Sequence, residues 1–399
     1  MSNNTYIDMI KAKAEQVYPT VVEIRRRFHQ NPELSEYETE TCQFIMDTLQ
    51  NLGIEHQRIA GNGVVATIYG NGSSAKTIGI RGDIDALPIT EETGLPYASK
   101  NPGVMHACGH DMHGAVLLGT AMILQSMREQ IPGNVKLFFQ PAEETVGGAA
   151  QMIEAGCMEN PKVDAVIALH VEEKKPLGII ELKHDAMNAS TTEFCMNVNG
   201  ASCHGAHPDL GVDAIVIAAN IITSLQTIIS RNLDPAEALV ITVGTIQGGT
   251  KENVVAGQVR MTGTLRSLTY ENRDFAKKRM QAIASSVAEA YGGTCTVDFN
   301  DGYPPLINDG PVTDALAAVA AEAFGPESVS FKKNASLGAD DFAFFCHEVP
   351  SSYFNIGASD FSKGTPAPAH SECFNPEEEC MKYAMVMEAA GALKLMETI

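Results

Sequence analysis

The residues best suited to chemistry in this chain are a Cys and a His that flank a single Gly. They are Cys108 and His110, in the segment HACGHDMH at residues 106–113. A thiolate and an imidazole two residues apart can reach one metal ion from a turn, and Gly109 lets the backbone bend so that both side chains converge. Taken alone, the segment fits a buried packing Cys among surface or capping His residues equally well.

A pair of carboxylates follows an apolar stretch at 135–139, in the segment QPAEE at 140–144. Neighbouring carboxylates at the end of a strand repel each other in a closed site, and a dication removes that penalty. We infer that Glu144 binds the metal, while Glu143 stays unligated and accepts a proton from the attacking water. For an isolated pair, a solvated acidic turn is the favoured interpretation.

Three further residues extend the pattern. His170 directly follows the apolar stretch 163–169, and His370 lies on a loop far along the chain. Asp85 follows a strand at 77–80 and could orient a ligating His. Sheets of parallel strands place ligands beyond the carboxyl ends of their strands, so these segments together predict one site for two ions, with a bridging thiolate.

The elements that must position these residues alternate between helix and strand over the first 187 residues. Helical patterns cover 7–30, 38–52 and 113–129, and apolar runs cover 63–68, 77–80, 135–139 and 163–169. This alternation is typical of an α/β fold, with a mixed, largely parallel sheet flanked by helices.

The middle of the chain has a different order, βαββαβ. Strands are expected at 194–198, 238–246, 258–265 and 294–299, and helices at 212–230 and 271–291. This order predicts a ferredoxin-like α+β domain at 188–300. Helix and strand alternate again afterwards, so the catalytic domain is expected to be discontinuous, at 1–187 and 301–399.

Composition excludes several classes of protein. The 399 residues favour two domains, and the net charge of −21 repels phosphate backbones and anionic membrane surfaces, so we expect no nucleic-acid partner. We also expect no membrane span, because no apolar run approaches ~20 residues. The first twenty residues lack a secretory signal, and the nine Cys form no C-x-x-C pair. These features predict reduced thiols and a cytoplasmic location.

The motifs closely resemble the aminoacylase branch of the co-catalytic metallopeptidase superfamily, which includes hippurate hydrolases, plant auxin-conjugate hydrolases and N-acetyl-diaminopimelate deacetylases. The match runs in order over nearly the whole chain. The matching segments are RRFH at 26–29, PEL at 32–34, RGDIDALP at 81–88, HACGHDMH at 106–113, PAEE at 141–144, GGA at 147–149, ALH at 168–170, GADDF at 338–342 and HS at 370–371.

The resemblance implies roles for individual residues. The metal-ligand positions correspond to Cys108, His110, Glu144, His170 and His370. Glu143 takes the position of the general base, and Asp85 that of the supporting acid.

The resemblance also implies that the inserted domain is a lid and dimerisation module. Its His204 would reach the partner subunit's active site to stabilise the oxyanion, in a homodimer or a dimer-based tetramer. The segment GASCHGAHP at 200–208 departs from the usual glycine-rich form, which makes His207 a weaker competitor for this role. Asn253 and Arg266 match lid positions that contact substrate or carboxylate.

The resulting hypothesis is a metal-dependent amidohydrolase that cleaves N-acyl amino acids to a carboxylate and a free amino acid. Two divalent ions per subunit, Zn, Mn, Co or Ni, would be required. N-acetyl-diaminopimelate deacetylase and dipeptidase or carboxypeptidase activity on the same site are alternatives. A thiol amidase that uses Cys108 with His110, and a metal-binding homologue without activity, are the alternatives of other classes.

Overall fold

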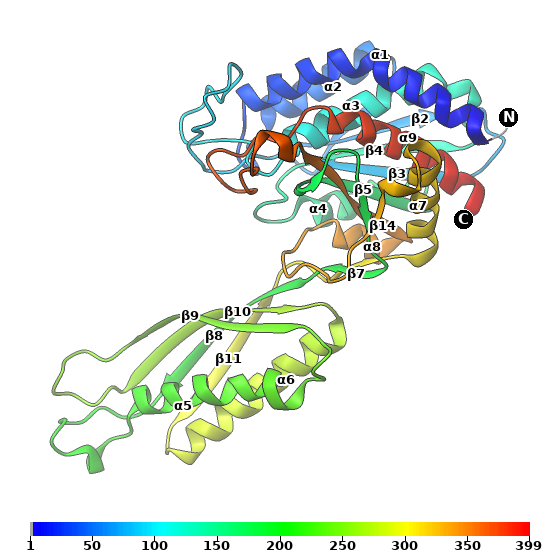
Figure 1. The fold of residues 1–399 in the computed structure, drawn as a ribbon. Coiled ribbons are helices and arrows are strands. Elements are labelled where there is room, and N and C mark those ends of the chain that lie inside the picture. The colour runs from blue at the N-terminus through cyan, green and yellow to red at the C-terminus, as the bar shows by residue number, and fades with distance from the viewer. Residues whose placement is uncertain (1–2) are drawn as a thin grey trace. The chain divides into compact units, whose positions relative to one another are not determined.

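The computed structural model describes residues 3–399, which divide into two compact units (Figure 1). The first unit contains the described residues up to Asp185, together with Ile307–Asn334 and Asp341–Ile399. The second contains Ala186–Leu306 and a short later stretch, Ala335–Asp340. The sequence boundaries at 187/188 and 300/301 lie within a few residues of the first two changes of unit, and the later stretch had no counterpart in the sequence analysis.

The first unit is built on an eight-stranded sheet of order β1-β2-β4-β3-β5-β14-β6-β13. Parallel pairing joins β3 to β4 and β5, β5 to β14, and β6 to β13, while β1/β2, β2/β4 and β6/β14 are antiparallel. The predicted mixed, largely parallel sheet is therefore confirmed. The strands are β1 (Glu55–Ile59), β2 (Gly63–Tyr69), β3 (Thr77–Asp83), β4 (Asn134–Gln140), β5 (Ala165–Pro176), β6 (Ile180–Leu182), β13 (Val329–Phe331) and β14 (Ser351–Ser359).

Helices cover both faces of this sheet. On one face α3 and α9 contact the central strands and α1 packs on both helices, as Figure 1 shows. On the other face Phe345 of α8 stacks on Phe138 of β4, with 5.3 Å between ring centroids. The helices of this unit are α1 (Asn3–Gln30), α2 (Thr39–Asn51), α3 (His110–Ser126), α4 (Gly148–Glu154), α7 (Gly310–Phe324), α8 (Ala343–Glu348) and α9 (Cys380–Thr398).

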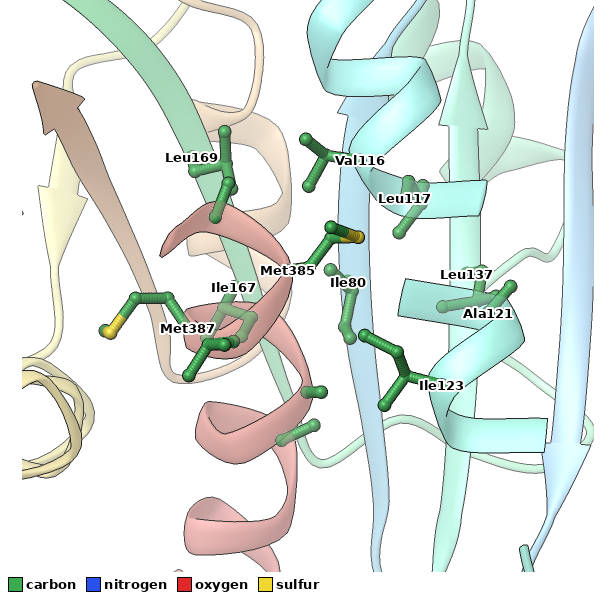
Figure 2. Close-up of a cluster of buried hydrophobic side chains, with 14 of the residues drawn as sticks. Ile80, Val116, Leu117, Ala121, Ile123, Leu137, Ile167, Leu169, Met385 and Met387 are labelled. Atoms are coloured by element: carbon green, nitrogen blue, oxygen red, sulfur yellow. The ribbon is translucent and has the colours of Figure 1, made fainter. Parts of the chain in front are cut away.

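The core between α3, α9 and the sheet is apolar and tightly packed (Figure 2). Residues two apart on a strand point to the same face, so Ile167 and Leu169 of β5 both reach the helices, beside Ile80 of β3. Met385 of α9 fills the space next to them. Each such side chain contributes about 1.5–3 kcal/mol by its burial, which anchors the strand ends from which the predicted ligands project.

One predicted strand end is wrong in an informative way. The apolar run predicts a strand that ends at residue 169, but β5 continues to Pro176 and His170 lies within it. Pairing with β3 stops at Ala168, whereas pairing with β14 continues past His170, which is paired with Asn355. His170 therefore lies directly after the point where β5 stops pairing with β3.

The second unit contains an antiparallel sheet of order β11-β8-β10-β9. Helices α5 and α6 pack on it over their own apolar core (Figure 1). Asp213 caps α5 and Thr269 caps α6 by accepting amide hydrogen bonds. In chain order the elements are β8 (Ser190–Asn199), α5 (Ala214–Thr227), β9 (Leu239–Gly248), β10 (Gln258–Ser267), α6 (Tyr270–Ala290) and β11 (Thr294–Asp301). The short strands β7 (Asp185–Asn188) and β12 (Leu306–Asn308) pair with each other.

One helix among the described residues is long and apolar enough to cross a membrane. It runs through α5 and a π-helical segment as Ala214–Asn232, with a mean hydropathy of 1.4 over a window that is 33% buried. The sequence predicts a helix at 212–230 here, and the observed helix lies two residues further along the chain. A single helix of this kind is weak evidence for a membrane span, and Ile217, Ile221 and Leu225 face the core of the second unit.

Glu388 of α9 generates a prediction about stability. Its side chain is buried against α3, where Thr120 Oγ1 donates a hydrogen bond to Glu388 Oε2 at 2.6 Å, and burial raises its pKa to about 8. The folded chain therefore keeps a proton that the unfolded chain releases above about pH 4.3. The free energy of unfolding should fall as pH rises from there to about 8, by on the order of a few kcal/mol.

Glu388→Gln keeps an oxygen that can accept the hydrogen bond from Thr120 and removes the carboxyl group that titrates. We expect urea denaturation at fixed metal content to give a flatter dependence of the free energy of unfolding on pH for this variant than for the wild type. Parallel curves for the two proteins between pH 5 and 9 would contradict the assignment.

Candidate metal centre

The structure brings the five predicted ligands together in two groups that share Cys108. One group is Cys108, His110 and His170, and the other is Cys108, Glu144 and His370. Within each group, one ligand atom from every residue lies within 4.8 Å of the others. Cys108 Sγ is 3.4 Å from His170 Nε2, and Glu144 Oε1 is 3.3 Å from His370 Nε2. Two cations could therefore share one sulfur.

The turn between Cys108 and His110 depends on Gly109. Its φ of 95° is in the left-handed region, and a Cβ there would lie 2.3 Å from Val171 Cγ2. Any other residue would be strained by both its backbone and its side chain. The turn leads directly into α3, which begins at His110, three residues earlier than predicted.

His370 reaches the centre from a distant loop. Its own backbone is left-handed, with a φ of 63°, and its amide donates a hydrogen bond to Ala107 O at 2.7 Å. This bond ties the His370 loop to the residue that precedes Cys108. The ring is 53% exposed, so His370 is the ligand candidate nearest to solvent.

The donor set fits divalent cations. Glu144 Oε1 is buried and accepts no hydrogen bond among the described residues, although two imidazole nitrogens lie within 4.0 Å. Burial alone would raise the pKa of Glu144, but the His370 and His110 rings lower it, so the carboxylate is charged. Thiolate, imidazole and carboxylate are the ligands that Zn and similar ions take in proteins.

The surroundings of Cys108 favour a metal ligand over a nucleophile. Burial raises the pKa of its thiol above the usual range, and Glu144 and Glu143 add to this, although His110 acts in the other direction. A thiol that stays protonated at neutral pH is a weak nucleophile, whereas a cation makes the thiolate directly. This argues against the thiol amidase considered from the sequence.

Asp85 contacts one residue of each ligand group, His110 of the first and Glu144 of the second. Its Oδ1 is 3.0 Å from His110 Nδ1, and its Oδ2 accepts hydrogen bonds from the Glu144 amide at 3.0 Å and from Ser35 Oγ at 2.7 Å. Burial would raise the pKa of Asp85, but these bonds, that of His110 first, lower it. Asp85 therefore orients the ring of one ligand and the backbone of another.

Sequence reasoning assigned no role to Asp83 or His113, which form a second such support. His113 Nδ1 is 2.6 Å from Asp83 Oδ1, and His113 Nε2 accepts a hydrogen bond from the Val171 amide at 3.0 Å. Arg81 Nη1 pairs with Asp83 Oδ2 at 2.6 Å. The signal in the sequence was the spacing of three between His110 and His113, which places both on one face of a helix.

Glu143 lies beside the ligands without belonging to either group that shares Cys108. It is buried, and one of its carboxylate oxygens is within 4.8 Å of ligand atoms of His110 and Glu144. A carboxylate in this position can accept a proton from a water molecule at the centre.

The remaining predicted residues belong to the second unit, and the structure describes them there. His204 and His207 are exposed on one loop with ring centroids 5.6 Å apart, and His204 Nδ1 accepts a hydrogen bond from the Ala206 amide. Asn253 is exposed between β9 and β10, and its carbonyl accepts a hydrogen bond from the Gly205 amide at 2.8 Å. Arg266 is on β10, paired with Thr191 and Val240. Their roles stay predictions.

Comparisons with known proteins agree with the geometry. The family model "Peptidase family M20/M25/M40" matches residues 79–391. Thermostable carboxypeptidase 2 of Saccharolobus solfataricus is 37% identical over 97% of this chain and 98% of its own length. N-acetyl-L-cysteine deacetylase of Bacillus subtilis is 40% identical over 84% of this chain and 80% of its own length.

A solved structure adds information on metals. The Bacillus subtilis YXEP protein, described as a dinuclear metal binding peptidase from the M20 family, is 32% identical to this chain. The likeness covers 96% of this chain and 100% of that chain, with a TM-score of 0.85.

The shared position of Cys108 predicts that its loss weakens metal binding in both groups. Cys108→Ala should lower the affinity for both ions by more than the ~10–100-fold typical of an outer partner. Elemental analysis and calorimetric titration with Zn²⁺ measure this, with Cys157→Ala, another buried thiol, as the control. If the Cys108→Ala variant still binds two ions tightly, Cys108 is not a ligand shared by both.

Proposed function

The chain belongs to peptidase family M20/M25/M40, and we propose on that premise that it is a metal-dependent amidohydrolase acting on N-acyl amino acids. Hydrolysis of amide and peptide bonds is the chemistry of its relatives. The observation that carries the proposal is the pair of donor groups joined at Cys108, with Glu143 beside them. The products would be a carboxylate and a free amino acid.

The five ligands would hold two divalent ions, which we propose to be Zn, Mn, Co or Ni. When bound, such ions lower the pKa of a water and polarise the carbonyl that it attacks. Cys108 would contribute to both ions, His110 and His170 to one, and Glu144 and His370 to the other. Asp85 would keep the His110 ring in place.

The protein's own residues would move the proton. Glu143 accepts it from the attacking water and returns it to the leaving amine, so one carboxylate serves both half-steps. His204 of the partner subunit would donate a hydrogen bond to the oxyanion, an interaction worth about 3–4 kcal/mol when one such donor is removed. His207 is the weaker candidate for this donor, and Asn253 and Arg266 would bind the substrate.

One alternative on the same site has direct support. A carboxypeptidase is among the relatives at 37% identity over nearly the whole chain, so cleavage of short peptides is the second candidate. Deacetylation of N-acetyl-diaminopimelate is a narrower form of the main proposal. A panel of N-acetyl, N-benzoyl and dipeptide substrates, assayed with each of the four metals, separates these activities. A homologue without activity is disfavoured because Glu143 is retained beside the ligands.

The base assignment gives a direct prediction. Glu143→Gln removes the proton acceptor and keeps all five ligands, so we expect bound metal within error of the wild type and kcat lowered at least ~100-fold. Elemental analysis and steady-state kinetics measure the two quantities. Near-full turnover in this variant would show that another group takes the proton.

We further propose that the second unit is a ferredoxin-like lid that forms a homodimer, or a dimer-based tetramer. The order β8-α5-β9-β10-α6-β11 and the antiparallel sheet support the fold type. Strand β9 is an edge strand, and Ile246 on it is 52% exposed, as is 48% of Ile215 on α5. A long edge strand beside exposed apolar side chains is suited to pairing with a second copy. The cytoplasmic location remains a prediction.

The dimer is testable at this edge. Ile246→Lys places a charge on the exposed edge, and we expect it to shift the protein from dimer to monomer in light scattering coupled to gel filtration. If His204 acts across the dimer, kcat should fall with the dimer while metal content stays constant. Tyr291→Lys, at another exposed apolar position of the second unit, is the control. A fully active monomeric wild type would rule out the dimer.

A further inference from the structure

The two backbone amides that flank Glu143 are each held by a buried carboxylate. The Ala142 amide donates a hydrogen bond to Glu38 Oε1 at 2.8 Å. The Glu144 amide donates one to Asp85 Oδ2 at 3.0 Å. The pKa of Asp85 is lowered, by the His110 bond first, against the effect of burial, so the second acceptor is charged and its bond is of the stronger kind. The peptide that follows Glu143 and the peptide that precedes Ala142 are therefore fixed, by two different segments of the chain.

The backbone of Ala142 has an unfavourable conformation that its neighbours must stabilise. Ala142 has a φ of 55°, in the left-handed region that residues with a Cβ rarely adopt. The turn is closed by a hydrogen bond from the Gly147 amide to Ala142 O at 3.0 Å. The direction in which Glu143 leaves the backbone depends on this left-handed residue, because Ala142 immediately precedes it.

Glu38 is itself held rigidly. Its side chain is 0% exposed, and it also accepts hydrogen bonds from the Glu36 amide at 3.1 Å and from Asn62 Nδ2 at 3.3 Å. Asn62 is fixed in turn by Arg58, whose Nη2 donates to Asn62 Oδ1. Because these hydrogen bonds hold the Glu38 carboxyl group in one position, it can in turn hold the amide from which it accepts a hydrogen bond.

Glu38 is not required to cap its own helix. It stands at the N-cap position of α2 but makes no side-chain capping hydrogen bond there. The first amides of α2, those of Glu40 and Thr41, are instead accepted by Glu33 at 3.1 and 2.8 Å. Two carboxylates of one short segment thus have separate tasks: Glu33 holds the helix and Glu38 holds the turn that carries Glu143.

We propose that Glu38 is a positioning residue for the hydrolytic reaction. It acts through the Ala142 peptide, and it keeps the Glu143 carboxylate aimed at the water that is to be deprotonated. This rests on the proposed function, in which Glu143 is the base. Because Glu38 touches neither substrate nor metal ligand, its loss should change kcat with little effect on KM or metal content.

The test compares Glu38→Met with Glu38→Gln, which keeps a carbonyl oxygen for the Ala142 amide, and with the control Glu33→Met. For the Met variant at position 38 we expect kcat at least tenfold lower, KM within threefold of the wild type and two ions bound. Glu38→Gln should stay within about threefold in kcat. Glu33→Met should lose thermal stability but keep kcat within twofold. Hydrogen exchange of the peptide covering 140–147 should become faster in Glu38→Met but not in Glu38→Gln or Glu33→Met.

Shortening the side chain provides a second route if Glu38→Met does not fold. Glu38→Asp keeps the carboxyl group but withdraws it from Ala142, so kcat should fall and exchange at 140–147 should rise. Wild-type kcat and exchange in a folded Met or Asp variant would overturn the proposal. Glu143→Gln is assayed alongside: an active Glu143→Gln variant refutes the base, whereas an inactive one beside fully active Glu38 variants refutes only the positioning role.

Discussion

The centre depends on the compensation of negative charge among buried and half-buried side chains. The thiol of Cys108 and the carboxyl group of Glu144 lie among ligand atoms a few ångströms apart, and burial opposes the ionisation of both. The His370 and His110 rings overcome this effect for Glu144, whereas His110 offsets only part of it for Cys108. Two dications would remove the rest, so metal binding contributes directly to the stability of this part of the fold.

Asp83 and Asp111, two buried acids outside the ligand set, each pair with an arginine. Asp83 pairs with Arg81, which also reaches Asp341 Oδ1 at 2.7 Å. Asp111, next to the ligand His110, pairs with the buried Arg25 at 2.9 Å. These pairs lower the pKa of Asp83 and Asp111 against the effect of burial. The structural acids thus remain charged whether or not metal is bound, and they hold the start of α3 and the end of β3 in place.

Local pattern predicted the sheet and the ligands, because both leave a signal in short segments. Continuous apolar runs are typical of strands buried on both faces, and metal-binding residue types directly follow several of them. The place of His170 within β5 depends on how far β14 continues to pair, which no local pattern encodes. Glu38 received no role for the same reason: it acts on Ala142, which is 104 residues away. Contacts of that kind follow from strand order and register, which a single sequence does not display.

The hydrogen bond between His370 and Ala107 has a consequence for biosynthesis. Four of the ligand candidates are translated before the second unit, and His370 is translated after it. For the group of Cys108, Glu144 and His370, a chain still on the ribosome can therefore offer an ion only an incomplete set of ligands until the ribosome has passed position 370. An ion captured there earlier would lack one ligand, so this half of the proposed centre would be completed only when the nearly finished polypeptide closes the His370 loop.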